Sequence, residues 1–293
     1  MRRRRFLEVA GAGAALGRTT IGGERPSGDA GTGLYERLVR ANDARVPALL
    51  QRQETGSTHP WRGAVRDEHD VPSPGGTAGL VATLVSALAA PESRFAASSE
   101  LAARLSLASQ GLLAFQHPDG TIDLATTNFH SPPDTAFVLE PVCASLSVVR
   151  QMRPPMPAEA VASLERFARA AGEALVAGGI HTPNHRWVVC AALARVHALF
   201  PDARFVARVD EWLAEGIDID ADGQFSERST SVYSPTCDRA FLTVARLLGR
   251  EALLDPVRRN LEMTLIYHHA GGDVATEASR RQDQYRRGSP AGY

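Results

Sequence analysis

The spacing of apolar residues constrains this chain more than any other feature. Nine segments place apolar side chains three and four residues apart, which is the repeat of one buried face of an α-helix. They cover 34–53, 77–90, 98–116, 135–152, 158–177, 185–200, 203–215, 237–248 and 251–268. Strand-like alternation is scarce, and Pro, Gly, Asp and Ser stand where these helices start and stop. The pattern predicts an all-α fold.

Helices with short connections pack as antiparallel hairpins, which leaves a bundle, a solenoid or an α/α toroid, incomplete or complete. An internal similarity favours the toroid. Asp119-Gly120 is followed by Ser131-Pro132, and Asp222-Gly223 by Ser234-Pro235, with the same separation of glycine and serine in both copies. Two such loops, too far apart for one hairpin, predict a helical array that presents equivalent loops at one end. The alternative is coincidence between two loops of low information.

The first residues predict export. Arg3-Arg4-x-Phe6-Leu7 and the short Ala/Gly-rich stretch behind it match a twin-arginine signal, which we assign to 1–17. A basic nucleic-acid-binding arm would rarely be followed by such an apolar stretch. Residues 18–33, rich in Gly, Ser, Thr and Pro, are expected to form a flexible linker, and 34–293 the toroid domain. We therefore expect a periplasmic or extracellular protein.

Composition excludes several classes of function. The 44% hydrophobic and 22% charged residues are ordinary for a globular protein. After the signal no apolar run is long enough for a membrane span, and the net charge of −1 gives no general attraction to nucleic acid. The three cysteines are far apart and form no metal or redox motif, and His268-His269 lacks the spacing of a helical metal pair. We predict no metal and no cofactor, and the oligomeric state stays open.

Three polar constellations could carry chemistry. Asn184-His185 stands at a predicted helix start, and the two similar loops place His130 and Tyr233 at equivalent positions. Taken singly, each has a plainer explanation. The asparagine could cap its helix, the histidine could be partly buried, and the tyrosine could simply pack.

Together these residues resemble a known family. Asn184-His185, followed by D-G-x-F-x-E-R-S-x-x-x-Y ending at Tyr233, resembles the catalytic region of heparinase II/III-like polysaccharide lyases. Residues 61–67, 128–137 and 279–283 are also similar to that group. The resemblance implies an α/α toroid and a carbon–oxygen lyase acting on an anionic, uronic-acid-containing polysaccharide. We expect the β-sandwich domain that usually follows such a toroid to be absent.

The resemblance also implies roles for single residues. Asn184 would neutralise the uronate carboxylate, Tyr233 would act as acid and base, and His185 would assist. These types suit β-elimination, because the enolate that forms carries more negative charge than the substrate and gains more from a donor aimed at its carboxylate. An arginine beside the phenol, such as Arg228 or Arg239, would favour the phenolate that serves as base.

Further residues are expected to bind the substrate. They are Asn128, His130, Arg228, Arg239, Trp61 and Arg62. Trp61 could stack on a sugar face, although a core position is an alternative, and 280–283 could reach an anionic substrate or form a solvated surface.

Two other functions stay open. One is a glycoside hydrolase that uses two carboxyls among Asp222, Glu227, Asp134 and Asp238, and the other is a noncatalytic glycan-binding protein.

Overall fold

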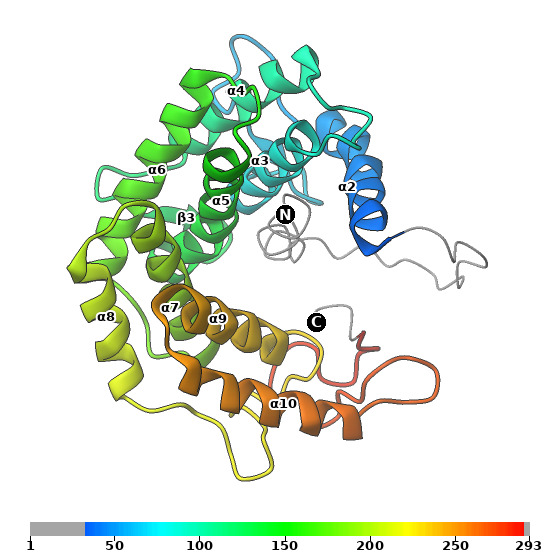
Figure 1. The fold of residues 1–293 in the computed structure, drawn as a ribbon, viewed down its shortest axis with the longest axis vertical. Coiled ribbons are helices and arrows are strands. Elements are labelled where there is room, and N and C mark those ends of the chain that lie inside the picture. Colours follow the sequence, from blue (N-terminus) through cyan, green and yellow to red (C-terminus); the bar gives the residue numbers. More distant parts are fainter. Residues whose placement is uncertain (1–32, 290–293) are drawn as a thin grey trace. The chain divides into compact units, whose positions relative to one another are not determined.

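The computed structural model describes residues 33–289 and confirms the all-α prediction (Figure 1). Nine α-helices lie in this range: α2 (Leu34–Gln51), α3 (Pro74–Ala89), α4 (Ser99–Ala114), α5 (Pro132–Met152), α6 (Ala158–Ala177), α7 (Pro183–Leu199), α8 (Ala203–Ala214), α9 (Tyr233–Leu248) and α10 (Leu254–Ile266). The 3-10 helix η1 (Glu251–Leu253) precedes α10. The proposed signal at 1–17, and the linker up to residue 32, lie outside the described residues.

Two short antiparallel ribbons stand among the helices. Strand β1 (Val65–Arg66) pairs with β2 (Pro72–Ser73), and β3 (Ile122–Leu124) pairs with β4 (Asn128–Ser131). Each ribbon lies in the connection between two helices, so it shapes a loop.

The chain divides into two compact units, with the boundary between Ala171 and Gly172. In unit 1, which ends at Ala171, α3 packs against α2, α4 and α5. In unit 2, which begins at Gly172, α7 packs against α8 and α9, and α9 also packs against α10. Helices α3, α5 and α7 are buried on most sides, whereas α8 buries a single stripe, so each unit has apolar helices covered by amphipathic ones.

Four helices, α3, α5, α7 and α9, begin earlier than the apolar spacing indicated. Ser73 and Ser131 cap α3 and α5 by accepting hydrogen bonds from the backbone in the first turn, and a proline follows each serine. A first turn made of Pro, Ser and Gly carries no apolar repeat, so the spacing could not detect it. Helix α9 begins at Tyr233, so Ser234-Pro235 lies inside its first turn and does not open it as expected.

The loop similarity seen twice in the sequence corresponds to a turn that occurs four times in the described residues. Each copy pairs one residue that follows a helix with a glycine further along the chain. The backbone N–H of the first residue donates to the carbonyl of the residue after the glycine. The carbonyl of the first residue accepts the backbone N–H of the glycine. The glycines are Gly63, Gly120, Gly223 and Gly272, after α2, α4, α8 and α10, and their φ values lie between +83° and +93°. Only glycine adopts this conformation at little cost.

A buried apolar side chain stands two residues after each of these glycines. The four residues are Val65, Ile122, Phe225 and Val274, each at most 3% exposed. The turn thus pins its loop to the core of its unit. The internal similarity of the sequence did not reveal the turns at Gly63 and Gly272. A longer insertion precedes Gly63, and no Ser-Pro pair follows Gly272 at the same distance.

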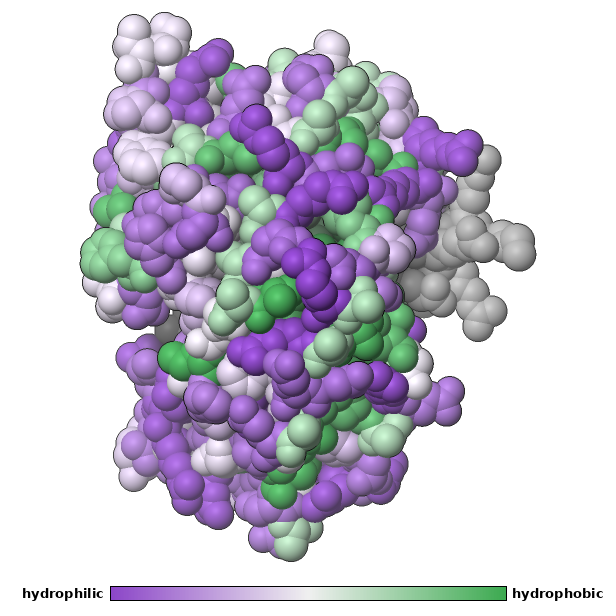
Figure 2. Space-filling model, turned by 90° about the vertical axis from the view of Figure 1, so that its left-hand side faces the viewer, coloured by the Kyte–Doolittle hydropathy of each residue, from purple (hydrophilic) through white to green (hydrophobic). Residues whose placement is uncertain are grey.

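Within residues 33–289, no helix is both long enough and apolar enough to span a membrane. On the face drawn in Figure 2, hydrophilic side chains predominate and apolar ones appear in small separate groups.

Candidate functional site

Glu227 is the centre of a buried polar cluster in unit 2. Its side chain is almost enclosed, and both carboxylate oxygens accept hydrogen bonds of 2.8 Å from Nδ2 of Asn184. Asn184 lies in the first turn of α7, and its backbone N–H also donates to Glu227, at 3.3 Å. The carboxylate therefore caps α7, whose N-cap residue Thr182 makes no side-chain bond of this kind, and the helix dipole favours its negative charge.

Burial raises the pKa of Glu227 and outweighs the hydrogen bonds from Asn184 and the charge of Arg281, which act to lower it. Asn184 itself is 0% exposed, and its amide donates to Glu227. The sequence hypothesis required this amide to be open to a substrate carboxylate. The structure instead gives it a carboxylate of the protein, because the loop after Gly223 carries Glu227 onto the start of α7.

Tyr233 begins α9 beside this cluster, with its side chain partly exposed. Its hydroxyl donates to Oε1 of Gln282 at 2.8 Å, and the guanidinium carbon of Arg281 lies 4.7 Å from the centroid of its ring. Hydrogen bonding to Tyr233 raises the pKa of Arg281 above its usual value. Arg281 also approaches Glu227, with Nε 3.4 Å from Oε1. Asn184 and Tyr233 thus belong to one network, joined through Glu227 and Arg281.

The arginine beside Tyr233 differs from the two that the sequence suggested. Arg228 is directed to Asp220, 3.7 Å away, and Arg239 bonds within its own helix. Arg281 takes the place beside the phenol from a segment that follows α10. The similarity of 279–283 to the lyase family was the available signal for it.

The remaining residues at the start of α7 are partly structural. His185 is partly exposed in the first turn. Arg186 is 8% exposed, donates to Glu215 at 2.8 Å, and lies 4.2 Å over the ring of Trp187. These contacts tie α7 to the loop after α8.

In unit 1, His130 belongs to a pair of stacked imidazoles. Its ring lies 4.0 Å from that of His117, with an angle of 20° between the planes. Nδ1 of His130 bonds to Asp119 at 2.7 Å, and Nε2 of His117 bonds to Asp123 at 2.8 Å. Bonds from Thr121, and then from His130, hold the pKa of Asp119 well below its usual range. The backbone of His130 has a φ of +47°, an uncommon conformation for a residue with a side chain.

The other proposed binding residues of unit 1 are exposed. Nδ2 of Asn128 donates to Asp134 at 3.0 Å. Trp61 is 38% exposed and stacks on Phe115, with ring centroids 4.9 Å apart, and Arg62 beside it is exposed. Trp61 is therefore neither a core residue nor an isolated surface ring, since one of its faces packs on the protein.

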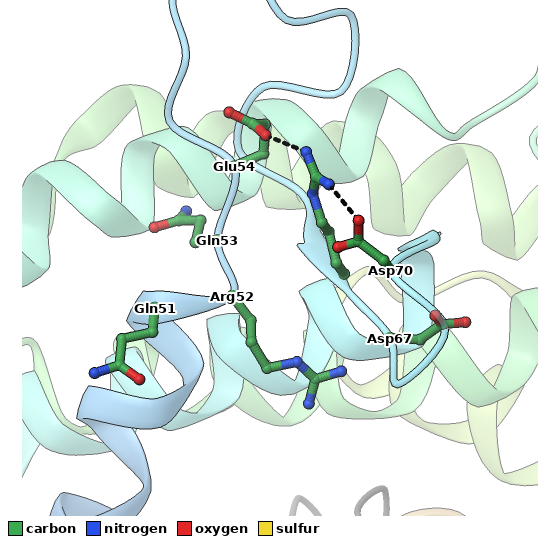
Figure 3. Close-up of a pocket in the computed structure, with 7 residues that line it drawn as sticks. Gln51, Arg52, Gln53, Glu54, Asp67 and Asp70 are labelled. Carbon is green, nitrogen blue, oxygen red and sulfur yellow. Dashed lines mark hydrogen bonds and ion pairs between the residues drawn. The ribbon is translucent and has the colours of Figure 1, made fainter.

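A cavity of about 330 Å³ lies elsewhere in unit 1 (Figure 3). It is lined by polar side chains, with Arg66 held between Glu54 at 2.6 Å and Asp70 at 2.9 Å. None of the residues that the sequence proposed for the site lines this cavity. The charge of Arg66 is thus already paired with two carboxylates of the same cavity.

The three cysteines are buried and form no disulfide among the described residues, and burial raises the pKa of Cys190 to about 12 and that of Cys237 well above its usual value. Such thiols are poor nucleophiles. Between residues 33 and 289, no three His, Cys, Asp or Glu side chains are grouped in a way that could hold a metal ion.

Comparison with solved structures identifies the type of fold. A crystal structure of D-mannose isomerase matches with a TM-score of 0.55 and 11% sequence identity, over 88% of this chain and 77% of that one. The chain has a fold of the α/α toroid type, as predicted. At this identity the likeness concerns the fold alone.

A polysaccharide lyase structure also matches, with a TM-score of 0.35 and 9% identity, over 81% of this chain and 46% of the lyase. The chain thus spans about half the length of that lyase, and the low score adds nothing to the argument. No family model and no curated protein matches the sequence. The resemblance to heparinase II/III-like lyases therefore stays a prediction.

Proposed function

We propose that the chain is a carbohydrate-active enzyme, and more narrowly a lyase that cleaves an anionic, uronic-acid-containing polysaccharide by β-elimination. The observation that carries the proposal is the environment of Tyr233. Its phenol is partly exposed, lies against the Arg281 guanidinium and bonds to Gln282. A phenol held at the surface between a cation and an amide is placed to exchange a proton with a bound substrate, which is the acid/base role proposed for Tyr233.

In the proposed reaction the Tyr233 phenolate removes the proton from C5 of the uronate. The electron pair of the C5–H bond forms the C4–C5 double bond, the C4–O4 bond breaks, and the phenol returns its proton to the leaving O4. The uronate carboxylate gains negative charge as C5 loses its proton, so a fixed cation nearby lowers the barrier. Arg281 can supply that charge, and Asn184 holds the Glu227 carboxylate that Arg281 approaches.

The test is a panel of uronate-containing polymers, followed by absorbance of the conjugated double bond. Tyr233→Phe removes only the hydroxyl, and the rate should fall at least about 100-fold, as expected when an acid/base group is lost. Tyr35→Phe is the matched control, since it also removes one tyrosine hydroxyl, which in unit 1 donates to Glu92, and its rate should stay near that of the wild type. Equal rates for wild type and Tyr233→Phe would refute the role of the tyrosine.

A glycoside hydrolase is the second candidate, and Glu227 favours it. A carboxyl group whose pKa is raised by burial suits a general acid. Hydrolysis would give new reducing ends without ultraviolet absorbance. The fold is shared with a D-mannose isomerase, so aldose–ketose conversion should be measured in the same panel. Binding without any change in polymer length would indicate a noncatalytic protein.

A further inference from the structure

Asp283 is a buried anchor behind Tyr233. Its side chain is 3% exposed and accepts hydrogen bonds from three serine hydroxyls. Ser229 and Ser231 donate to Oδ2 at 2.8 Å each, and Ser279 donates to Oδ1 at 2.5 Å. Two of these serines belong to the loop directly before Tyr233, so one carboxylate ties together two segments that are distant in sequence.

The segment tied down in this way carries both side chains that contact the phenol. Arg281 and Gln282 stand between Ser279 and Asp283, inside the turn that these two close. The backbone N–H of Arg281 donates to the hydroxyl of Ser279 at 3.1 Å. The position of both side chains therefore depends on the turn.

The same anchor reaches the start of α9. The hydroxyl of Ser229 donates to Asp283 and accepts the backbone N–H of Tyr233 at 3.0 Å. The backbone N–H of Arg280 donates to the carbonyl of Glu227 at 3.0 Å, which gives the turn a second attachment to the loop. The positions of the Tyr233 phenol and of its two partners, Arg281 and Gln282, thus all depend on the buried carboxylate of Asp283.

A carboxylate is a costly group to bury, and it is retained in a protein when hydrogen bonds compensate for the lost water. Three converging hydroxyls do so here. An apolar side chain could fill the same space, but it could not fix the direction of the turn. We propose that Asp283 is a positioning residue that holds Arg281 and Gln282 on Tyr233. This inference rests on the proposed role of Tyr233.

The first test does not depend on activity. The side-chain protons of Arg281 should be shifted upfield by the ring current of Tyr233, and in arginine-labelled protein their signal is assigned by its loss in Arg281→Lys. Ser231→Ala removes one anchor bond and Asp283→Ala removes all three. We expect the shift to shrink in the first and to vanish in the second. Ser226→Ala is the control, because it deletes a serine–aspartate bond of the same 2.8 Å length to Asp218.

The second test uses the polymer on which the wild type is active. Misplacing a catalytic side chain by about 1 Å can lower a rate about 100-fold, so kcat should fall between roughly 10-fold and 100-fold in Ser231→Ala, with KM nearly unchanged. Asp283→Asn keeps one acceptor oxygen and should recover part of the rate lost in Asp283→Ala.

The outcomes separate the two proposals. An unchanged Arg281 signal in folded Ser231→Ala would overturn the positioning role, even if Asp283→Ala fails to fold. If the wild type cleaves no polymer, the proposed function fails, whereas the signal still decides whether Asp283 holds the turn. A loss of kcat in Ser226→Ala equal to that in Ser231→Ala would also count against the positioning role.

Discussion

The pairing of Asn184 with Glu227 is the feature that most changes the chemistry expected of single residues. An amide was expected to face the substrate, and it faces a buried carboxylate of the protein. The carboxylate in turn contacts Arg281, which lies on Tyr233. The polar groups behind the phenol are therefore joined in one network, although the buried Oδ1 of Asn184 has no hydrogen-bond partner among the described residues. The side chains left partly exposed include those of Tyr233, Arg281 and His185.

Glu227 should make stability depend on pH in a direction opposite to that of most carboxylates. Its pKa is 4.5 in an unfolded chain and higher in the folded protein, because burial disfavours the charge. Between the two values the folded state binds more protons, so the free energy of unfolding falls as pH rises. Glu227→Gln stays neutral and should lack this loss, which amounts to about 1.4 kcal/mol per unit of pKa difference.

Urea unfolding of wild type and Glu227→Gln at several pH values between 4 and 8 measures the effect. The wild type should lose stability relative to the variant as pH rises above 4.5. Parallel curves across this range would mean that Glu227 is not held in a raised-pKa site.

At the scale of elements, the repeated glycine turn explains where the chemistry lies. The turns after α4, α8 and α10 open connections that hold several of the side chains discussed for the site, whereas Asn184 and His185 belong to the first turn of α7. Glu227 and Tyr233 follow the turn at Gly223, His130 follows the one at Gly120, and Arg281 follows the one at Gly272. Each turn anchors its loop through a buried apolar residue, so side chains further along the loop can vary without disturbing the helices.

Gly223→Ala should destabilise the protein strongly. Gly223 has a φ of +88°, and an added Cβ would lie 2.5 Å from the carbonyl oxygen of Arg259. We expect a loss of about 1–3 kcal/mol, the usual range for a residue held in a disfavoured conformation. Gly79→Ala is the control, since Gly79 lies inside α3 with no atom within 4 Å of the added Cβ, and it should gain roughly 0.5–1 kcal/mol. Urea unfolding curves measure both changes in stability, and equal unfolding midpoints for the two variants would contradict the prediction.

For the molecule as a whole, the fold is of the α/α toroid type, and a fold by itself does not select the chemistry. The candidate site of unit 2 is complete within that unit, from α7 to the segment after α10. The stacked histidine pair and Trp61 belong to unit 1.

Export is a property of the whole chain that we propose from its first residues. Arg3 and Arg4 should direct a reporter fused to residues 1–33 through the twin-arginine pathway. Replacing both arginines by lysine should retain the reporter inside the cell, which fractionation of the cells measures. Equal export of both fusions would show that the basic start has another role.

The sequence by itself determined the helices, because apolar residues recur at the helical spacing both in α8, which buries one stripe, and in α3, α5 and α7, which are buried on most sides. It also indicated the two Asp-Gly turns and the part of unit 2 around Asn184 and Tyr233. It could not show that Asn184 bonds to Glu227 or that Arg281 lies on Tyr233, since these pairs join segments distant in the chain. Only tertiary structure brings such segments together, because hydrogen bonds between loops depend on how the helices below them pack, and no local pattern encodes that packing.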